Sequence, residues 1–269
     1  MHSIPLGQDT EYRFEYDAGL LAPIPRALGR EKLAIDANQF VGVDVWNAYE
    51  VSWLNRRGLP QVRLAKLSVP CDSPCIVESK SLKLYFNGFN QSAFDSEEEV
   101  QAIMQRDISA CVGAQVALLL VPVESSEVFL PAVMPGTCID QQDISCGQYQ
   151  TDVSLLQSRE GRVDQQRLYS HLLRSLCPVT GQPDWASVFI EYSGQCIDEA
   201  SLLRYIVSFR NQQDFHELCV ETIFSHLWQR FDLESLTVYA RYLRRGGIDI
   251  SPLRSSHKVV LDDWRQLRQ

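Results

Sequence analysis

The chain has 269 residues and carries 25 Lys and Arg against 34 Asp and Glu, which gives a net charge of −9. Hydrophobic residues make up 45% of the chain and charged residues 22%, which is typical of a globular protein and not of a disordered one. The acidic balance argues against sequence-independent binding to nucleic acid, so an anionic ligand would need a local cluster of basic side chains.

The sequence shows neither a targeting segment nor a cysteine pattern typical of a metal site. The N-terminal MHSIPLGQDTEYRFEY lacks the basic start and apolar core of a signal peptide, and the longest apolar run, VALLLVPV, is too short to span a bilayer. The 8 cysteines show no repeated spacing, and no second pair or nearby histidine completes a zinc set around Cys71 and Cys75. Two small buried thiols are a simpler interpretation of that pair than a metal site or a disulfide. We therefore expect a cytoplasmic protein with reduced thiols and no bound metal.

The first half of the chain begins with a predicted β-hairpin. Residues 49–55 and 61–69 show the alternation of strands on either side of the turn RRGLP. The segment 79–89 then predicts a helix, with Ser79 available as its N-cap. Its apolar side chains recur with helical spacing on one face, at Leu82, Tyr85, Phe86 and Phe89.

A second helix is predicted over 95–111, where DSEEE gives an acidic first turn that suits the helix dipole. The apolar run at 116–123 follows as a strand. Residues 124–160 are rich in Pro, Gly, Asp and Gln and predict a connection between two halves of the chain.

The second half repeats the order of the first. Strands are predicted over 161–174 and 185–193, helices over 201–209 and 216–231, and a strand over 235–243.

A shift of 120 residues superimposes the two halves at the helices. It places Ser81, Leu82, Tyr85 and Phe89 on Ser201, Leu202, Tyr205 and Phe209, and Val100, Ile103 and Met104 on Val220, Ile223 and Phe224. Amphipathic helices can match by chance because they share a period, but identity at four positions favours a duplication. The inferred unit runs strand-strand-helix-helix-strand-strand, an α+β layer. We predict modules over 1–125 and 161–269 joined by 126–160, with one site where the halves meet.

Cys177 and Asp184 in SLCPVTGQPDW are the first candidates for chemistry. The cysteine follows a predicted strand and precedes a proline, so we expect it at a strand-to-turn junction. A thiol acts as a nucleophile only as thiolate, and Asp184 could move the proton that a covalent mechanism requires. The alternative is a cysteine that only packs.

His216 and Glu217 are adjacent at the start of a predicted helix. They could serve as a first-turn cap and dipole partner. The functional alternative is a proton-handling imidazole beside a carboxylate that recognises N–H groups of a ligand.

Basic side chains gather at two places on this acidic chain. Lys80 and Lys83 lie in ESKSLKLY, and Arg244 and Arg245 precede a glycine pair in YLRRGGIDI. Helix-surface lysines are usually only solvated, but glycine lets backbone N–H groups approach a phosphate while arginine supplies bidentate donors. Because the chain has no Gly-x-Gly-x-x-Gly or phosphate-loop motif, any nucleotide is not bound in Rossmann fashion.

Four motifs in this order resemble the NADPH-dependent 7-cyano-7-deazaguanine reductases of queuosine biosynthesis: ESKSLKLY, SLCPVTGQPDWASVFIEY, SFRNQQDFHE and RRGGIDISP. The N-terminal LLAPIPR and the order of the motifs resemble the long, two-module branch. The resemblance covers nearly the whole chain, with no departure at the motif positions. It implies an α+β fold of tandem tunnelling-fold (T-fold) modules, related to GTP cyclohydrolase I, with the site between the modules.

The resemblance also implies roles for single residues. Cys177 matches the nucleophile that forms a covalent thioimide with the nitrile, and Asp184 matches the proton donor. The matched substrate-binding positions are Val77, Glu78, Ser79, His216 and Glu217. The matched NADPH-binding positions are Ser79, Lys80, Arg245 and Gly246.

The resulting expectation is a reductase of a small-molecule nitrile that uses NADPH, forms a homodimer, and contacts neither nucleic acid nor membrane. A rival of another class is a thiol hydrolase or cyclohydrolase on the same fold, although a cyclohydrolase would need a zinc set. A third interpretation is a catalytically silent module that binds a purine or pterin. Consumption of NADPH in the presence of the nitrile separates the three.

Overall fold

The computed structural model describes residues 14–33, 35–125, 130–260 and 263–269. It confirms the predicted α+β class. The chain forms two compact units, each assembled from separate stretches. Unit 1 comprises Met1–Gly29, Val43–Phe129 and Arg244–Ile250, and unit 2 comprises Arg30–Gly42, Leu130–Leu243 and Ser251–Gln269.

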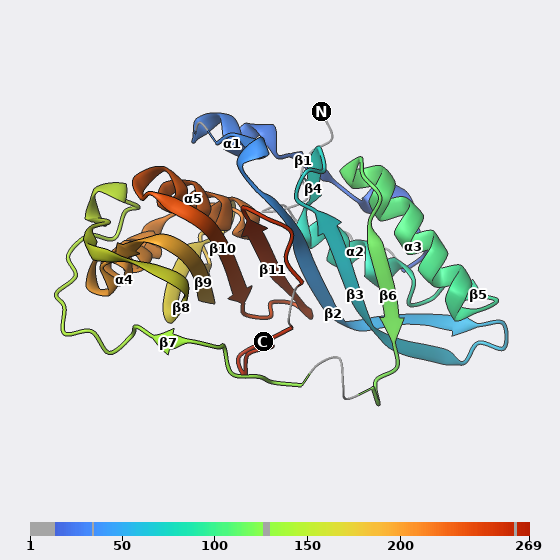
Figure 1. Ribbon diagram of the computed structural model, residues 1–269. Helices are drawn as coiled ribbons and strands as arrows, with labels where there is room; N and C mark the ends of the chain where they lie inside the picture. The colour runs from blue at the N-terminus through green and yellow to red at the C-terminus, as the bar shows by residue number, and fades with distance from the viewer. Residues whose placement is uncertain (1–13, 34, 126–129, 261–262) are drawn as a thin grey trace. The chain divides into compact units, whose positions relative to one another are not determined.

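Unit 1 contains an antiparallel sheet with helices on one side (Figure 1). Its long hairpin is formed by β2 (Val41–Asn55) and β3 (Pro60–Pro70), and β6 (Ala117–Val121) pairs with the outer edge of β3. Between β3 and β6 the chain forms α2 (Ser79–Gly88) and α3 (Glu97–Val112). On the other side of β2 lies the beginning of β11 (Ile248–Ser255), whose residues up to Ile250 belong to this unit.

Short elements complete unit 1. The strand β1 (Pro23–Pro25) pairs with β4 (Cys75–Val77), and β5 (Ala93–Phe94) runs parallel to the end of β2. The short helix α1 (Ala27–Lys32) follows β1.

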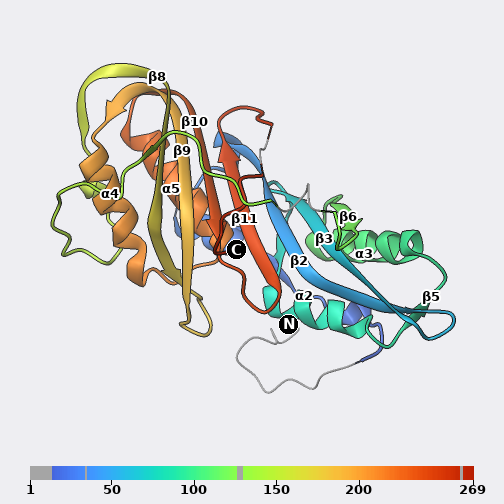
Figure 2. The same cartoon turned by 90° about the horizontal axis from the view of Figure 1, so that it is seen from below.

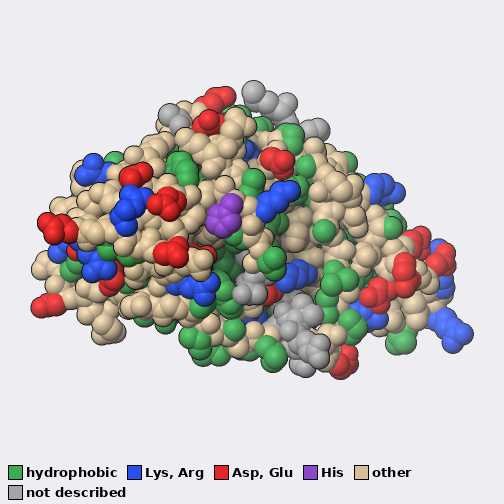
Figure 3. All heavy atoms as spheres, viewed as in Figure 1, with side chains coloured by type: hydrophobic (Ala, Val, Ile, Leu, Met, Phe, Trp, Pro, Cys, Tyr) green, Lys and Arg blue, Asp and Glu red, His purple; other side chains and the backbone are tan. Residues whose placement is uncertain are grey.

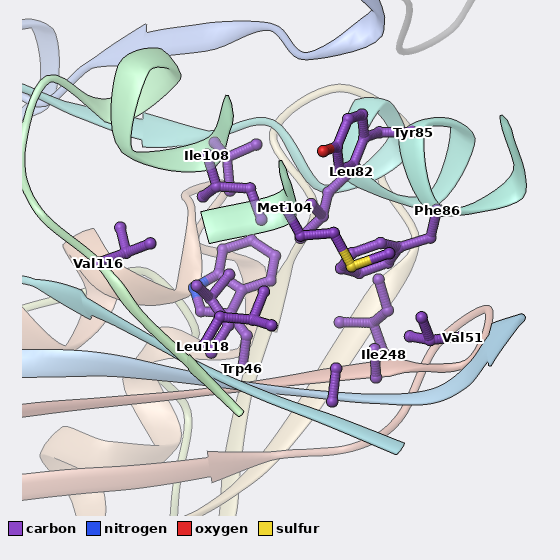
Figure 4. Close-up of a cluster of buried hydrophobic side chains, with 14 of the residues drawn as sticks. Trp46, Val51, Leu82, Tyr85, Phe86, Met104, Ile108, Val116, Leu118 and Ile248 are labelled. Carbon is purple, nitrogen blue, oxygen red and sulfur yellow. The ribbon is translucent and has the colours of Figure 1, made fainter. Parts of the chain in front are cut away.

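The core of unit 1 lies between the helices and the sheet. Figure 4 shows Trp46, Leu118 and Ile248 from the sheet facing Leu82 and Met104 from the helices. All five side chains are buried. Burial of the apolar face of each helix against the sheet is what stabilises these amphipathic segments as helices.

Unit 2 follows the predicted order in full. The antiparallel strands β8 (Ser158–Leu176) and β9 (Pro183–Ile197) are followed by α4 (Glu199–Ser208) and α5 (His216–Arg230), and then by β10 (Leu233–Tyr242). The strand β10 pairs with β9 and with the rest of β11, and β7 (Thr137–Cys138) runs parallel to β8. In Figures 1 and 2, α4 lies against β8 and α5 lies against β10.

The predicted strands and helices are confirmed, the short elements β1, β4, β5, β7 and α1 were not predicted, and two further features differ. Glu78 and not Ser79 is the N-cap of α2: its carboxylate accepts from the backbone N–H groups of Lys80 and Ser81. The strand β11 was missed because half of the residues in its sequence, IDISPLRS, are polar although all of them are buried. Its polar side chains are paired inside the protein, as where Asn47 Nδ2 donates to Asp249 Oδ1 at 2.9 Å.

Among the described residues, no helix has the length and apolar character needed to cross a membrane. On the face shown in Figure 3, Lys and Arg side chains are scattered among Asp and Glu side chains.

Candidate active site

Cys177 lies at the turn of the hairpin formed by β8 and β9. Leu176, the last residue of β8, pairs with Pro183, and the turn is closed by the Cys177 N–H, which donates to the Gln182 carbonyl at 2.8 Å. The Gly181 N–H donates back to the Cys177 carbonyl at 3.0 Å. Gly181 has φ of 67°, a left-handed conformation that glycine adopts without steric cost. The predicted strand-to-turn position of Cys177 is therefore confirmed.

The segment that precedes α5 runs along the end of β8, next to Cys177. The Leu176 N–H donates to the Gln212 carbonyl at 2.7 Å, and the Asp214 N–H donates to the Leu176 carbonyl at 3.1 Å. Because α5 begins at His216, these two bonds hold the start of the helix beside the turn that carries Cys177.

Asp184 and His216 form a direct contact. Asp184, on β9, is 2% exposed, and its Oδ2 lies 3.2 Å from His216 Nε2. The imidazole also stacks on the ring of Tyr242, the last residue of β10, with 3.8 Å between ring centroids and 10° between planes. Two strands and one helix thus converge on a carboxylate–imidazole pair.

Glu217 lies in the first turn of α5 and is buried. The N-cap position of this helix is Phe215, which offers no side-chain hydrogen bond, so neither His216 nor Glu217 is the cap. The position of Glu217 in the first turn favours interaction of its carboxylate with the helix dipole. Burial raises the pKa of neighbouring Asp214 above its ordinary value.

The thiols of the chain differ in their surroundings. Cys219, one turn into α5, is buried, and its burial raises the pKa of its thiol far above the ordinary value. Burial likewise raises the pKa of Cys111 to about 11. Cys177 is only partly buried. Since the thiolate is the nucleophile and burial opposes its formation, Cys219 and Cys111 are poorly suited to covalent chemistry.

In unit 1, the predicted residues Val77 to Lys80 span the junction of β4 and α2. Val77 ends β4, and Glu78 caps the helix with Oε1 accepting from the Lys80 N–H at 2.8 Å and Oε2 accepting from the Ser81 N–H at 2.7 Å. Glu78 is 1% exposed. Each oxygen of a carboxylate can accept a further bond, so this capping role is compatible with ligand binding.

The glycine pair of RRGG forms a tight turn. The Arg245 N–H donates to the Ile248 carbonyl at 2.9 Å, and Gly246 and Gly247 have φ of 59° and 82°. Positive φ at both central positions is characteristic of a type I′ turn, which glycine adopts readily. A Cβ built on Gly247 would meet nothing within 4 Å, so its backbone is open to a close approach by a ligand.

The structure joins the two basic places noted in the sequence. A Cβ at Gly246 would lie 3.2 Å from Lys83 Cε, so the lysine stem packs against the turn. A cavity of about 180 Å³ is formed there, lined by Lys83, Asn87, Gly246, Gly247 and five other residues. This pocket combines a cation, side-chain amides and exposed backbone, which are groups that bind phosphates, with one carboxylate, that of Glu50.

The sequence-predicted residues fall into two sets. Unit 2 contains Cys177, Asp184, His216 and Glu217, and unit 1 contains Val77, Glu78, Ser79, Lys80, Arg245 and Gly246. The sequence did not single out Tyr242, which lies within the strand predicted over 235–243. Nothing in the sequence indicates that its ring stacks on His216.

Comparisons with known proteins give consistent matches. The family model "Nitrile reductase, 7-cyano-7-deazaguanine-reductase N-term" matches residues 12–120, and the model "QueF-like protein" matches residues 183–260. The NADPH-dependent 7-cyano-7-deazaguanine reductase of Dechloromonas aromatica is 51% identical over 100% of this chain and 96% of its own. The enzyme of the same name from Burkholderia orbicola is 50% identical over 98% of both chains. A crystal structure of the archaeosine synthase QueF-Like covers 38% of this chain and 99% of its own, with 15% identity and a TM-score of 0.32.

Proposed function

The chain belongs to the family of NADPH-dependent 7-cyano-7-deazaguanine reductases, and we propose that it reduces the nitrile of 7-cyano-7-deazaguanine to an aminomethyl group, as a step of queuosine biosynthesis. The observation that carries the proposal is Cys177 at its hairpin turn, on the chain segment that leads to the Asp184–His216 pair.

In the proposed mechanism, Cys177 adds to the nitrile carbon. A nitrile is a poor acceptor of hydride, so the addition of a thiolate together with a proton on nitrogen gives a thioimide that accepts hydride more readily. Asp184 delivers that proton, and its contact with His216 at 3.2 Å holds the carboxyl in place. Expulsion of the Cys177 thiolate after the first reduction leaves an imine, which is reduced in turn.

When bound, NADPH would supply one hydride to each of these two reductions while solvent supplies the remaining protons, so one nitrile would consume two NADPH. The residues proposed to hold it are Ser79, Lys80, Arg245 and Gly246. The open backbone at the glycine turn, with a cation packed against it, fits the phosphates of a dinucleotide.

Recognition of the deazaguanine ring is proposed for Glu217 and Glu78, with Val77, Ser79 and His216 as further contacts. Both carboxylates are buried, and a carboxylate accepts well from the paired N–H groups of a guanine-like ring. A site built around such acceptors rejects analogues that leave them without donors.

We propose in addition that the protein acts as a homodimer. Val133 and Leu267 are 83% and 90% exposed and line a cavity of about 540 Å³ in unit 2, an apolar surface of a kind often covered in assemblies. The mass in solution, measured by light scattering, tests this part.

Intact-mass spectrometry tests the mechanism directly. Wild-type protein mixed with the nitrile, without NADPH, should gain the mass of one substrate, and Cys177→Ala should gain nothing while still binding NADPH. Cys219→Ala serves as a matched control and should form the adduct. Persistence of the adduct in Cys177→Ala would assign the nucleophile to another cysteine, and absence of NADPH oxidation by wild type would contradict the reductase function.

A further inference from the structure

Tyr242 holds the imidazole of His216 from one side. The two rings are nearly parallel, with 3.8 Å between centroids and 10° between planes. Tyr242 is fully buried, at 0% exposure, so its ring is packed on the side away from His216 as well.

The second ring nitrogen of His216 makes this stack important. In most functional histidines, a hydrogen bond to one nitrogen sets the orientation of the ring and the role of the other. His216 Nε2 meets Asp184 at 3.2 Å, whereas Nδ1 is buried and has no hydrogen-bond partner among the described residues. The one contact with Asp184 does not fix the rotation of the imidazole about that contact. The plane of the imidazole is therefore set by the ring of Tyr242 on which it stacks.

Tyr242 is itself fixed. It pairs with Ala186 at the end of the β10–β9 ladder, and its carbonyl accepts from Gln269 Nε2 at 3.0 Å. Its hydroxyl lies near Cys219 and Ser175, and burial, with an electrostatic contribution from Cys219 next in effect, raises the pKa of this phenol well above its ordinary value. The hydroxyl therefore stays neutral, and the ring presents a rigid, uncharged surface to the imidazole.

We infer that Tyr242 is a positioning residue of the nitrile-capture step: by stacking on His216, it keeps Nε2 aimed at Asp184 and so holds the carboxyl in the orientation needed to deliver its proton. The inference rests on the proposed function. It concerns the ring of Tyr242 and not its hydroxyl, and it requires no contact between Tyr242 and the substrate.

The experiment compares aliphatic and aromatic replacements. Tyr242→Leu and Tyr242→Met remove the flat face, and two such variants are used in case one does not fold; Tyr242→Phe keeps the face. Tyr192→Leu is the matched control, because Tyr192 is a buried tyrosine of the same sheet, on β9, with its hydroxyl bonded to the Ile197 N–H at 3.1 Å. The readouts are the rate of adduct formation without NADPH as a function of pH, and crystal structures of the variants.

We expect both aliphatic variants to form the adduct at least about tenfold more slowly and with an altered pH profile, because small misplacements of a catalytic group cost large factors in rate. Tyr242→Phe should stay within about threefold of wild type. Tyr192→Leu should lose stability but keep the wild-type pH profile. The pH profile is interpreted with the titratable groups on the elements around His216. These groups are Asp184 on β9, Asp214 before α5, Glu217 and Cys219 on α5, and Tyr242 on β10.

Two results would overturn the inference. One is a capture rate and pH profile in the aliphatic variants that match those of Tyr192→Leu. The other is an equal loss in Tyr242→Phe, which would assign the effect to the hydroxyl. A wild-type protein that forms no adduct contradicts the proposed function instead. In that case the crystal structures of the variants test the positioning role of Tyr242. A distance still near 3.2 Å between His216 Nε2 and Asp184 Oδ2 in Tyr242→Leu would overturn the inference.

Discussion

Ser81 and Ser201, 120 positions apart in the chain, make the same hydrogen bonds in their two units. Each Oγ donates to the carbonyl of the helix N-cap residue, at 2.6 Å to Glu78 and 2.8 Å to Asp198, and accepts at 3.1 Å from a backbone N–H outside the helix. Each serine N–H donates to the carboxylate of the same N-cap residue at 2.7 Å. The predicted repeat is therefore visible in local structure and not only in helical periodicity.

Ser81→Ala and Ser201→Ala should lower the free energy of unfolding by similar amounts, about 1–3 kcal/mol each, because each leaves a buried backbone N–H without its acceptor. Chemical denaturation of both variants measures the effect. Ser154→Ala, which alters a serine on a short exposed helix, is the control and should change little. A large effect at only one of the two serines would contradict their equivalence.

Asp184→Asn should fold and bind substrate but form the adduct slowly, because an amide cannot deliver a proton to the nitrile nitrogen. General acid catalysis contributes about 10²–10⁴-fold, so we expect a loss in that range. Rapid-mixing measurements of adduct formation provide the test. Capture at the wild-type rate would show that another group supplies the proton.

Glu217→Gln should weaken nitrile binding more than folding, because it replaces an acceptor with a group that also presents a donor to the ring N–H groups. The expected loss is about 1.5–3 kcal/mol in binding, measured by titration with the substrate. Glu160→Gln, an exposed carboxylate on β8, is the matched control. If the variant unfolds early while its substrate affinity is normal, Glu217 serves the helix dipole and not the ligand.

Arg245→Ala should weaken NADPH binding about ten- to a hundredfold and leave adduct formation intact, because the nitrile is captured before hydride is transferred. Cofactor titration and intact mass measure the two effects separately. Arg57→Ala, at the exposed β2–β3 turn, controls for the loss of one positive charge. Unchanged NADPH affinity in Arg245→Ala would remove the residue from the site.

Glu221 couples stability to pH. Burial acts to raise the pKa of this carboxyl, but the guanidinium groups of Arg254 and Arg30, which it accepts from at 2.7 Å each, outweigh burial and hold the pKa below its ordinary value. This stabilisation is present above the unfolded-state pKa of about 4.3 and is lost as the pH falls through the lower folded-state pKa.

Glu221→Gln should therefore cost about 3–5 kcal/mol at neutral pH, because it leaves buried cations without their partner. The difference in unfolding free energy between wild type and variant should shrink on acidification, as urea titrations at several pH values can show. A difference that is constant with pH would indicate that the ion pair contributes no stability.

Much of the fold was predictable because apolar periodicity follows local geometry. The helical stripes at Leu82 and Tyr85, and the alternation along β9, identify their elements without tertiary information. The strand β11 was not predictable, since Asp249 and Arg254 are buried only because partners elsewhere in the chain satisfy them. The helix cap at Glu78 was misassigned by one residue, because a serine and a glutamate in adjacent positions are both able to accept from the helix N–H groups.

For the candidate site, motifs and spacing identified residue types but not their contacts. The Asp184–His216 pair joins a strand to a helix that begins more than thirty positions later, as the numbering shows, and no local pattern encodes that contact. The stack of Tyr242 and the packing of Lys83 on Gly246 depend in the same way on tertiary structure.

The division of the chain between its units bears on whether either half can be produced alone. Unit 2 includes Arg30–Gly42, which supplies Arg30 to Glu221 and packs Phe40 on Phe224, and unit 1 includes Arg244–Ile250 from near the other end. Any single cut between the modules would deprive each fragment of a strand or ion-pair partner. A gene fragment that encodes residues 161–269 would thus be an incomplete folding unit, whereas co-expressed fragments could complement each other by exchanging these segments.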